Sequence, residues 1–132
     1  MRTSPSSSPE LLGPAARAAG LWPRMSIFNL GERDDYRVPD GGLLRERLNR
    51  VRVPTAALVI EIVSPDDDTW KKVPFYGKHG VDELLIVDPQ KRRVDWMGLE
   101  PSGEYLALEG SRLIELGPAE LAQRLDWPPP VA

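Results

Sequence analysis

The chain has 132 residues, a net charge of −3 and 41% hydrophobic residues, which suits one soluble domain around one hydrophobic core. No apolar run approaches the roughly 20 residues that span a bilayer, so we expect no membrane insertion. The chain has no cysteine, which excludes disulfides and thiolate metal sites, and we expect a cytoplasmic protein. Residues 1–8 are rich in Ser and Pro and are expected to form a disordered tail, whereas residues 9–132 are expected to form the domain.

The negative net charge argues against a broadly basic surface for nucleic acid, whose phosphates attract Lys and Arg. Two local clusters are basic nevertheless. The first contains Arg45, Arg47, Arg50 and Arg52, and the second contains Lys91, Arg92 and Arg93. The plainer interpretation of the two clusters is a solvated strand edge and a hairpin turn, and local binding of phosphates is the alternative.

Hydrophobic periodicity and turn residues predict a mixture of helices and strands. In chain order we expect a helix over residues 9–20, strands over 24–30, 36–40 and 56–63, a helix over 70–79, strands over 84–87, 93–99, 105–108 and 112–116, and a short helix over 118–125. The second strand should end at Gly41 and Gly42, because paired glycines weaken a strand and favour a turn, which leaves Asp40 at a strand end. Trp70 and Trp96 are expected to cover the core.

The run over residues 56–63 is apolar on both faces, as in a central strand that is covered on each side. Acidic residues 66–68 and Gly80 delimit the helix that follows, and Pro74 must lie in its first turn or kink it. The order strand, helix, strand over residues 57–87 predicts a crossover between parallel strands. The predicted fold class is therefore α/β.

Glu61 is a single carboxylate within this apolar strand, and burying a bare charge costs more than a strand gains by forming. Period-two alternation places Glu61 on the same face as Val59. Lys72 lies on the following helix, which could bring its ammonium to that carboxylate, and Asp40 comes from an earlier element. Two carboxylates and a lysine suit Mg²⁺ or Mn²⁺ and metal-assisted phosphodiester hydrolysis. A structural ion pair between Glu61 and Lys72, with Asp40 as a turn residue, is the alternative.

Four segments of the chain, residues 37–40, 58–65, 70–76 and 79–89, resemble the Uma2 family of PD-(D/E)xK, restriction-endonuclease-like proteins. The resemblance extends over about residues 9–127. It implies a restriction-endonuclease-like mixed β-sheet flanked by α-helices and an endonuclease acting on DNA. It also implies a site in which Asp40 and Glu61 hold Mg²⁺ or Mn²⁺ and Lys72 completes the catalytic set. Lys71 is the alternative lysine, but Lys72 has the family's spacing to Tyr76.

Two departures from the family pattern motivate a second hypothesis. Many members carry a second Pro-Asp step just before the glutamate strand, where this chain has Ala56 and Ala57. Members also have a longer N-terminal segment with a further acidic residue, which this chain is expected to lack. The alternative function is therefore a truncated or degenerate, non-catalytic nuclease-fold protein that acts as a binding or assembly module. Sheet edges exposed in such a protein would also allow a homodimer.

Overall fold

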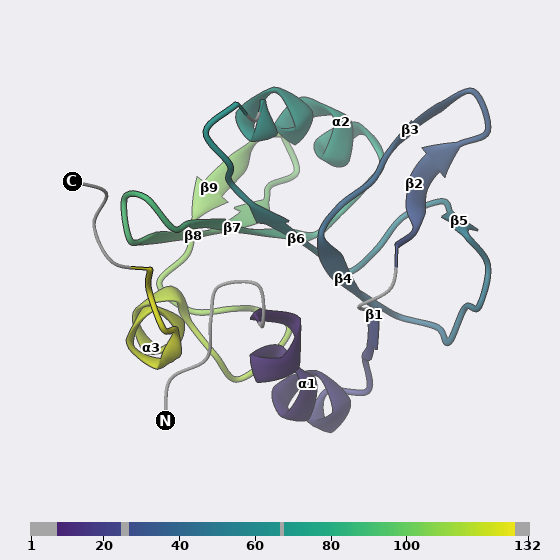
Figure 1. The fold of residues 1–132 in the computed structure, drawn as a ribbon. Helices are drawn as coiled ribbons and strands as arrows, with labels where there is room; N and C mark the ends of the chain where they lie inside the picture. The colour runs from purple at the N-terminus through teal and green to yellow at the C-terminus, as the bar shows by residue number, and fades with distance from the viewer. Residues whose placement is uncertain (1–7, 25–26, 67, 129–132) are drawn as a thin grey trace.

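The computed structural model describes residues 8–24, 27–66 and 68–128 (Figure 1). Residues 1–7 of the predicted tail lie outside this part of the chain, and Ser8 begins the first helix. The elements are α1 (Ser8–Ala18), β1 (Trp22–Arg24), β2 (Asn29–Glu32), β3 (Asp35–Arg37), β4 (Gly41–Leu44), β5 (Arg52–Val53), β6 (Leu58–Ile62), the 3₁₀ helix η2 (Thr69–Lys72), α2 (Val73–Lys78), β7 (Glu83–Asp88), β8 (Arg93–Leu99), β9 (Tyr105–Ala107) and α3 (Pro118–Arg124). Within the described ranges, no helix has the length and apolar character needed to cross a bilayer.

A six-stranded mixed sheet, in the order β1-β4-β6-β7-β8-β9, forms the centre of the molecule, and a three-stranded sheet, β3-β2-β5, lies beside it. The parallel pair β6 and β7 confirms the predicted crossover, in which η2 and α2 connect the two strands (Figure 1). The other neighbours in the large sheet are antiparallel. β1 and β9 are its edges, and the homodimer that such edges would allow stays a prediction.

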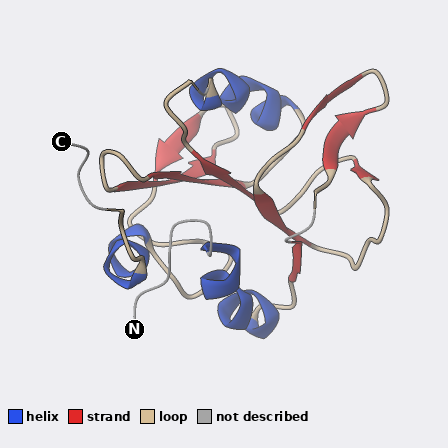
Figure 2. Ribbon diagram, in the orientation of Figure 1, coloured by secondary structure: helices blue, strands red, loops and turns tan. Residues whose placement is uncertain are grey.

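The two faces of β6 pack into different cores, because successive strand residues point to opposite sides of a sheet. Leu58 and Ile60 belong to the core that contains residues of α1 and α3. Val59 belongs to the core that contains Tyr76 of α2 and residues of the small sheet. Figure 2 shows this arrangement, with α2 on one side of the large sheet and α1 and α3 on the other. The alternation predicted for this strand is confirmed, and it directs Glu61 toward α2.

Gly41 and Gly42 do not form the predicted turn but open β4 as buried residues. A Cβ atom on Gly42 would lie 3.0 Å from the carbonyl oxygen of Leu58 and 3.1 Å from Cζ of Phe28. Glycine therefore allows the backbone of β4 to lie close to β6 and to the Phe28 ring. Packing outweighs the local turn preference here, and the strand predicted over residues 36–40 is reduced to β3, which ends before the Pro-Asp step.

Three further predictions differ from the structure. The strand predicted over residues 24–30 overlaps the last residue of β1 and the first two residues of β2, residues 27–28 belong to neither strand, and residues 25–26 lie outside the described part of the chain. The helix predicted over 70–79 is divided into η2 and α2, with Pro74 in the first turn of α2, where a missing backbone N–H costs nothing. The segment over 112–116 is no strand, since the N–H groups of residues 112–114 donate to side-chain oxygens and that of Leu116 donates to the Ile114 carbonyl oxygen within the segment.

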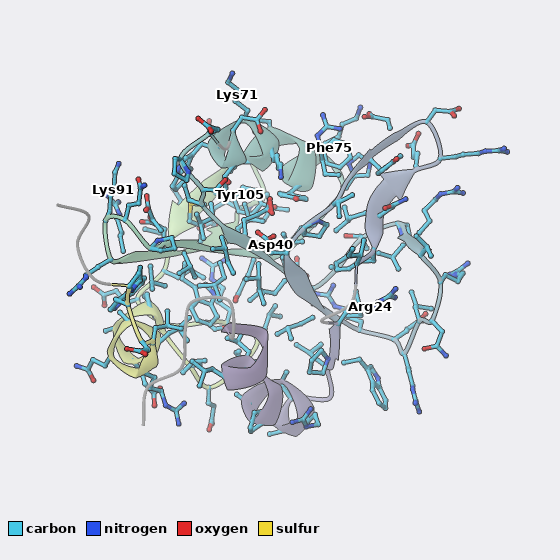
Figure 3. The ribbon with its side chains drawn as sticks, in the orientation of Figure 1. Arg24, Asp40, Lys71, Phe75, Lys91 and Tyr105 are labelled. Carbon is cyan, nitrogen blue, oxygen red and sulfur yellow. The ribbon has the colours of Figure 1, made fainter. Side chains whose placement is uncertain are left out.

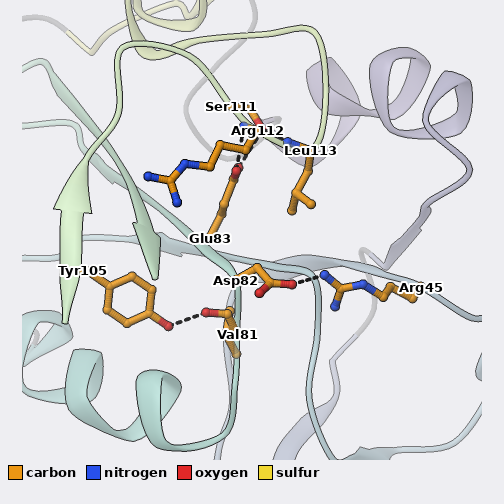
Figure 4. Close-up of polar contacts among 8 residues, drawn as sticks. All are labelled: Arg45, Val81, Asp82, Glu83, Tyr105, Ser111, Arg112 and Leu113. Carbon is orange, nitrogen blue, oxygen red and sulfur yellow. Dashed lines mark hydrogen bonds and ion pairs between the residues drawn. The ribbon is translucent and has the colours of Figure 1, made fainter. Parts of the chain in front are cut away.

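Glu83 holds the segment around residues 111–116 in its irregular conformation. Its side chain is 1% exposed and accepts hydrogen bonds from this segment (Figure 4). Ser111 Oγ donates to Glu83 Oε1 at 2.6 Å, and the backbone N–H of Arg112 donates to Oε2 at 2.7 Å. The indole N–H of Trp96 donates to Oε1 at 2.8 Å. Trp96 is buried as predicted, whereas Trp70 is 51% exposed, because η2 directs it away from the core. Glu83 therefore anchors the segment before α3 to the sheet.

The Glu83→Gln variant is expected to lower the free energy of unfolding by about 1–3 kcal/mol, since an amide nitrogen would face a buried donor. Thermal and urea denaturation measure this loss. Glu100→Gln is the matched control, because Glu100 forms a part-exposed ion pair with Arg112 that is worth about 0–1 kcal/mol. Equal losses in the two variants would contradict an anchoring role for Glu83.

Candidate functional site

Glu61 on β6 is 2% exposed and forms an ion pair with the lysine of the following helix. Lys72 Nζ lies 2.8 Å from Glu61 Oε1, and the lysine side chain is 23% exposed. Lys72 is the last residue of η2, where it reaches back over the strand that precedes the helix. Lys71 is exposed and points away from the sheet (Figure 3). The geometry therefore selects Lys72 over Lys71 as the partner of Glu61.

Asp40 lies beside Glu61, one position before β4. The β4–β6 ladder pairs Gly41 with Ile60, so continuing its register places Asp40 opposite Glu61. Two hydrogen bonds hold Asp40 there: its N–H donates to the carbonyl oxygen of Ile60 at 3.0 Å, and its Oδ2 accepts from the N–H of Ile62 at 2.7 Å. Directly opposed residues on antiparallel strands have Cβ atoms about 4.5–5.5 Å apart. The two carboxylates are thus cross-strand neighbours, with Asp40 exposed and Glu61 buried.

Tyr76 is the third group near Glu61, one helical turn after Lys72 on the buried face of α2, and it is 1% exposed. Burial raises the pKa of its phenol far above the ordinary value of 10, and the charges of Glu61 and Asp40 raise it further. Within the described ranges, the buried hydroxyl of Tyr76 has no hydrogen-bond partner. The Glu61 carboxylate is the largest charged contributor to the rise in this pKa. Tyr76 is therefore a protonated phenol in the electrostatic field of both carboxylates.

Arg37 borders the same site from β3. Its guanidinium carbon lies 4.4 Å from the centroid of the Phe75 ring, and its positive charge lowers the pKa of Tyr76, against the larger effects that raise it. His79 stacks on Phe75 with ring centroids 4.1 Å apart, and its Nδ1 lies 3.0 Å from the Phe75 carbonyl oxygen. In Figure 3, Phe75 lies at α2 and Asp40 lies at the central sheet.

Asp40, Glu61 and Lys72, which the sequence predicts as site residues, lie together in the structure, and Tyr76 and Arg37, for which no role was predicted, lie near them. The spacing of Lys72 and Tyr76, four residues apart, was the available signal, since such residues share a helix face. Within the described part of the chain, no group of three or more histidine or acidic side chains could hold a metal ion. The acidic component of the site is therefore the pair Asp40 and Glu61, with a lysine and a tyrosine on the opposing helix.

This architecture, a mixed sheet flanked by helices with one acidic residue on a central strand and another just before the neighbouring strand, is that of the restriction-endonuclease-like class. The chain is similar to a solved structure of "a putative nuclease belonging to DUF820 from Anabaena variabilis ATCC 29413", with a TM-score of 0.66 and 16% identity, over 93% of this chain and 83% of that one. The Uma2 family model, described as "Putative restriction endonuclease", matches residues 17–126. The chain belongs to the Uma2 family, as its resemblance indicated. No curated protein matches it significantly.

Proposed function

We propose that the protein is a divalent-metal-dependent endonuclease that hydrolyses phosphodiester bonds in DNA, with Asp40, Glu61 and Lys72 as its catalytic residues. The observation that carries this proposal is the buried Glu61 carboxylate, which has Lys72 Nζ at 2.8 Å on one side and the Asp40 carboxylate across the ladder on the other. Membership in a family whose description is "Putative restriction endonuclease" supports a nuclease role.

The donor set fits a small divalent cation. Mg²⁺ commonly binds through one or two carboxylates and keeps several waters, and an exposed carboxylate beside a buried one provides such a site open to solvent. Asp40 and Glu61 would hold Mg²⁺ or Mn²⁺. When bound, such an ion lowers the pKa of a water and offsets negative charge on a scissile phosphate.

The side chains of the chain itself supply orientation and charge. Lys72 places an ammonium at the edge of the site, where it can orient the attacking water or stabilise the charge that develops on the phosphoryl oxygens. Tyr76 stays protonated, because burial raises the pKa of its phenol, and we assign its hydroxyl the role of restraining the nearby Glu61 carboxylate. In the net reaction a water oxygen bonds to phosphorus, one phosphorus–oxygen ester bond breaks, and the leaving oxygen receives a proton.

The direct test is incubation of the purified chain with supercoiled plasmid and with single-stranded DNA, in Mg²⁺, in Mn²⁺ and in chelator. Cleavage that depends on the metal, together with calorimetric binding of Mn²⁺, is the expected result. A preparation that neither binds metal nor cuts either DNA would refute the proposal.

The Tyr76→Phe variant tests the positioning role of the hydroxyl. We expect metal affinity or activity to fall about 10- to 100-fold, as is typical when a group that orients a metal ligand is lost. Stability should change little, because the phenyl ring keeps its packing. Calorimetry, cleavage assays and thermal denaturation measure these three quantities.

Tyr105→Phe is the matched control for Tyr76→Phe. The Tyr105 hydroxyl, on β9, donates to the Val81 carbonyl oxygen at 2.6 Å (Figure 4). Burial raises its pKa, and no carboxylate contributes to that rise. We expect this control to lose about 1 kcal/mol of stability and to keep its activity. Equal activity losses in the two variants would show that tyrosine hydroxyls matter here only for folding.

A non-catalytic binding or assembly module is the second candidate, and Ala57 favours it. Ala57 is fully buried and supplies no ligand at the position where many Uma2 members carry an aspartate. In this case the Glu61–Lys72 ion pair is structural, and DNA or partner binding should be the same in wild type and Glu61→Gln. Metal-dependent cleavage by the wild type would exclude this candidate.

A further inference from the structure

One arginine holds the loop over residues 45–51, which follows β4, in a defined shape. Arg24 Nη1 donates to the carbonyl oxygens of Leu48 and Arg50, each at 2.9 Å, and its Nη2 donates to that of Ile27 at 3.4 Å. A guanidinium presents its donors in a rigid planar fork, so these contacts fix the loop relative to β1. The loop over residues 45–51 therefore has a defined position relative to β1.

This loop, β1 and the end of α1 line a groove of about 370 Å³. Three arginines, Arg17, Arg24 and Arg47, contribute to it, together with Trp22, Asn49 and three apolar residues. Arg17 and Arg47 are exposed, and the guanidinium carbon of Arg47 lies 5.6 Å from the Trp22 ring centroid. No acidic residue is among the described residues that line the groove, although the chain as a whole has a net charge of −3. Positive charge is thus concentrated here.

The groove lies along the strand that begins beside Asp40. In the β1–β4 ladder Arg24 pairs with Gly42, and Trp22 pairs with Leu44. At about 3.4 Å per strand residue, the paired positions lie about 7 Å and 14 Å along β4 from Asp40. Successive phosphates of one B-DNA strand are about 3.4 Å apart along the helix axis. If one phosphate of a DNA strand lies at Asp40, phosphates a few nucleotides away on the same strand would therefore reach the groove.

We propose that this arginine groove binds the phosphodiester backbone of the DNA strand next to the bond that is cleaved. Arginine matches phosphate in charge and in the geometry of paired hydrogen bonds. Arg17 and Arg47 make the contacts, and Arg24, whose donors hold the loop, adds to the positive potential. The proposal rests on the proposed nuclease function for the identity of the anion, whereas the groove and its charge rest on its own residues.

Fluorescence anisotropy with labelled duplex and single-stranded DNA, measured in chelator, tests binding without cleavage. The double variant Arg17→Gln/Arg47→Gln should bind duplex at least about tenfold more weakly at low salt. The slope of log association constant against log salt concentration should become less negative by about 1.8, since each of the two lost phosphate contacts contributes about 0.9 to that slope. Thermal denaturation should show no loss of stability, because both arginines are exposed.

The double variant Lys91→Gln/Arg93→Gln is the matched control, because it removes the same charge from the β7–β8 hairpin, where Lys91 lies in the turn and Arg93 begins β8. Lys91 lies across the molecule from Arg24 (Figure 3), and the Arg93 side chain is 63% exposed. The control should keep the affinity and salt slope of the wild type. Equal weakening in both double variants would refute the groove, because it would reflect net charge alone.

The two proposals fail separately. Cleavage by the wild type with unchanged DNA affinity in Arg17→Gln/Arg47→Gln would overturn the groove and leave the nuclease function intact. DNA binding that this variant weakens, in a wild type that never cleaves, would support the groove and refute the nuclease. A wild type that binds neither DNA form at low salt would overturn the groove. In an active enzyme the variant should raise KM and leave kcat unchanged.

Discussion

The Glu61→Gln variant is expected to lose metal-dependent DNA cleavage by roughly 10²- to 10³-fold, because a metal centre supplies several kcal/mol of transition-state stabilisation and each 1.4 kcal/mol is about tenfold in rate. The amide keeps the shape of the carboxylate and can still accept from Lys72, which lies 2.8 Å from Oε1 in the wild type. It removes the negative charge that a cation requires. Cleavage assays and Mn²⁺ calorimetry on the same preparation measure both losses.

The stability of Glu61→Gln should stay within about 1 kcal/mol of the wild type, because neutralising a buried charge also removes the cost of its desolvation. Glu83→Gln is the informative comparison, since Glu83 is the other buried glutamate among the described residues. That variant should lose stability and keep the activity of its folded fraction. If Glu61→Gln cleaves DNA as fast as the wild type, Glu61 has no catalytic role.

The Lys72→Met variant is expected to lose activity about 10²- to 10³-fold, the usual effect of removing one preorganised donor from a charge-stabilising site. It should also be less stable, because breaking a buried ion pair costs up to about 3–5 kcal/mol, and less where one partner is part exposed, as Lys72 is. Methionine keeps most of the aliphatic volume of the lysine. Single-turnover cleavage and urea denaturation measure the two effects.

Lys71→Met is the control for Lys72→Met, since it removes the same charge from the neighbouring, exposed position. It should leave stability unchanged and cleavage nearly so. Adding Glu61→Gln to Lys72→Met should restore part of the lost stability, because the carboxylate then carries no charge. Comparable activity losses in Lys71→Met and Lys72→Met would refute a specific role for Lys72.

The central part of the site could be predicted because its signals are local and strong. A carboxylate within an apolar strand must have a partner, and the strand, helix, strand order requires the next helix to cross back over the sheet. From those two facts, the sequence alone predicts that Lys72 lies near Glu61. The choice between Lys71 and Lys72 could not be made from residue chemistry, because it depends on the helical phase of η2 relative to β6.

The N-terminal side of the site was harder to predict, because Gly41 and Gly42 carry a local turn signal that packing overrides. Their lack of side chains serves the close approach of β4 to β6. This approach makes Asp40 the residue opposite Glu61. A turn at Gly41 and Gly42 would not pair β4 with β6. The wrong prediction of a turn therefore gave no structural reason for Asp40 to lie opposite Glu61.

By itself, the amino-acid sequence determined the α/β class, the buried central strand with its carboxylate, and the family to which the chain belongs. These features follow from hydrophobic periodicity and from motifs that are continuous along the chain. The tertiary structure alone decided that Asp40 lies opposite Glu61, that Tyr76 adjoins both, and that Arg17, Arg24 and Arg47 share one groove. Each of these arrangements brings together residues that are distant in sequence. Strand register and helix packing determine such contacts, and both are set only when the whole core is assembled.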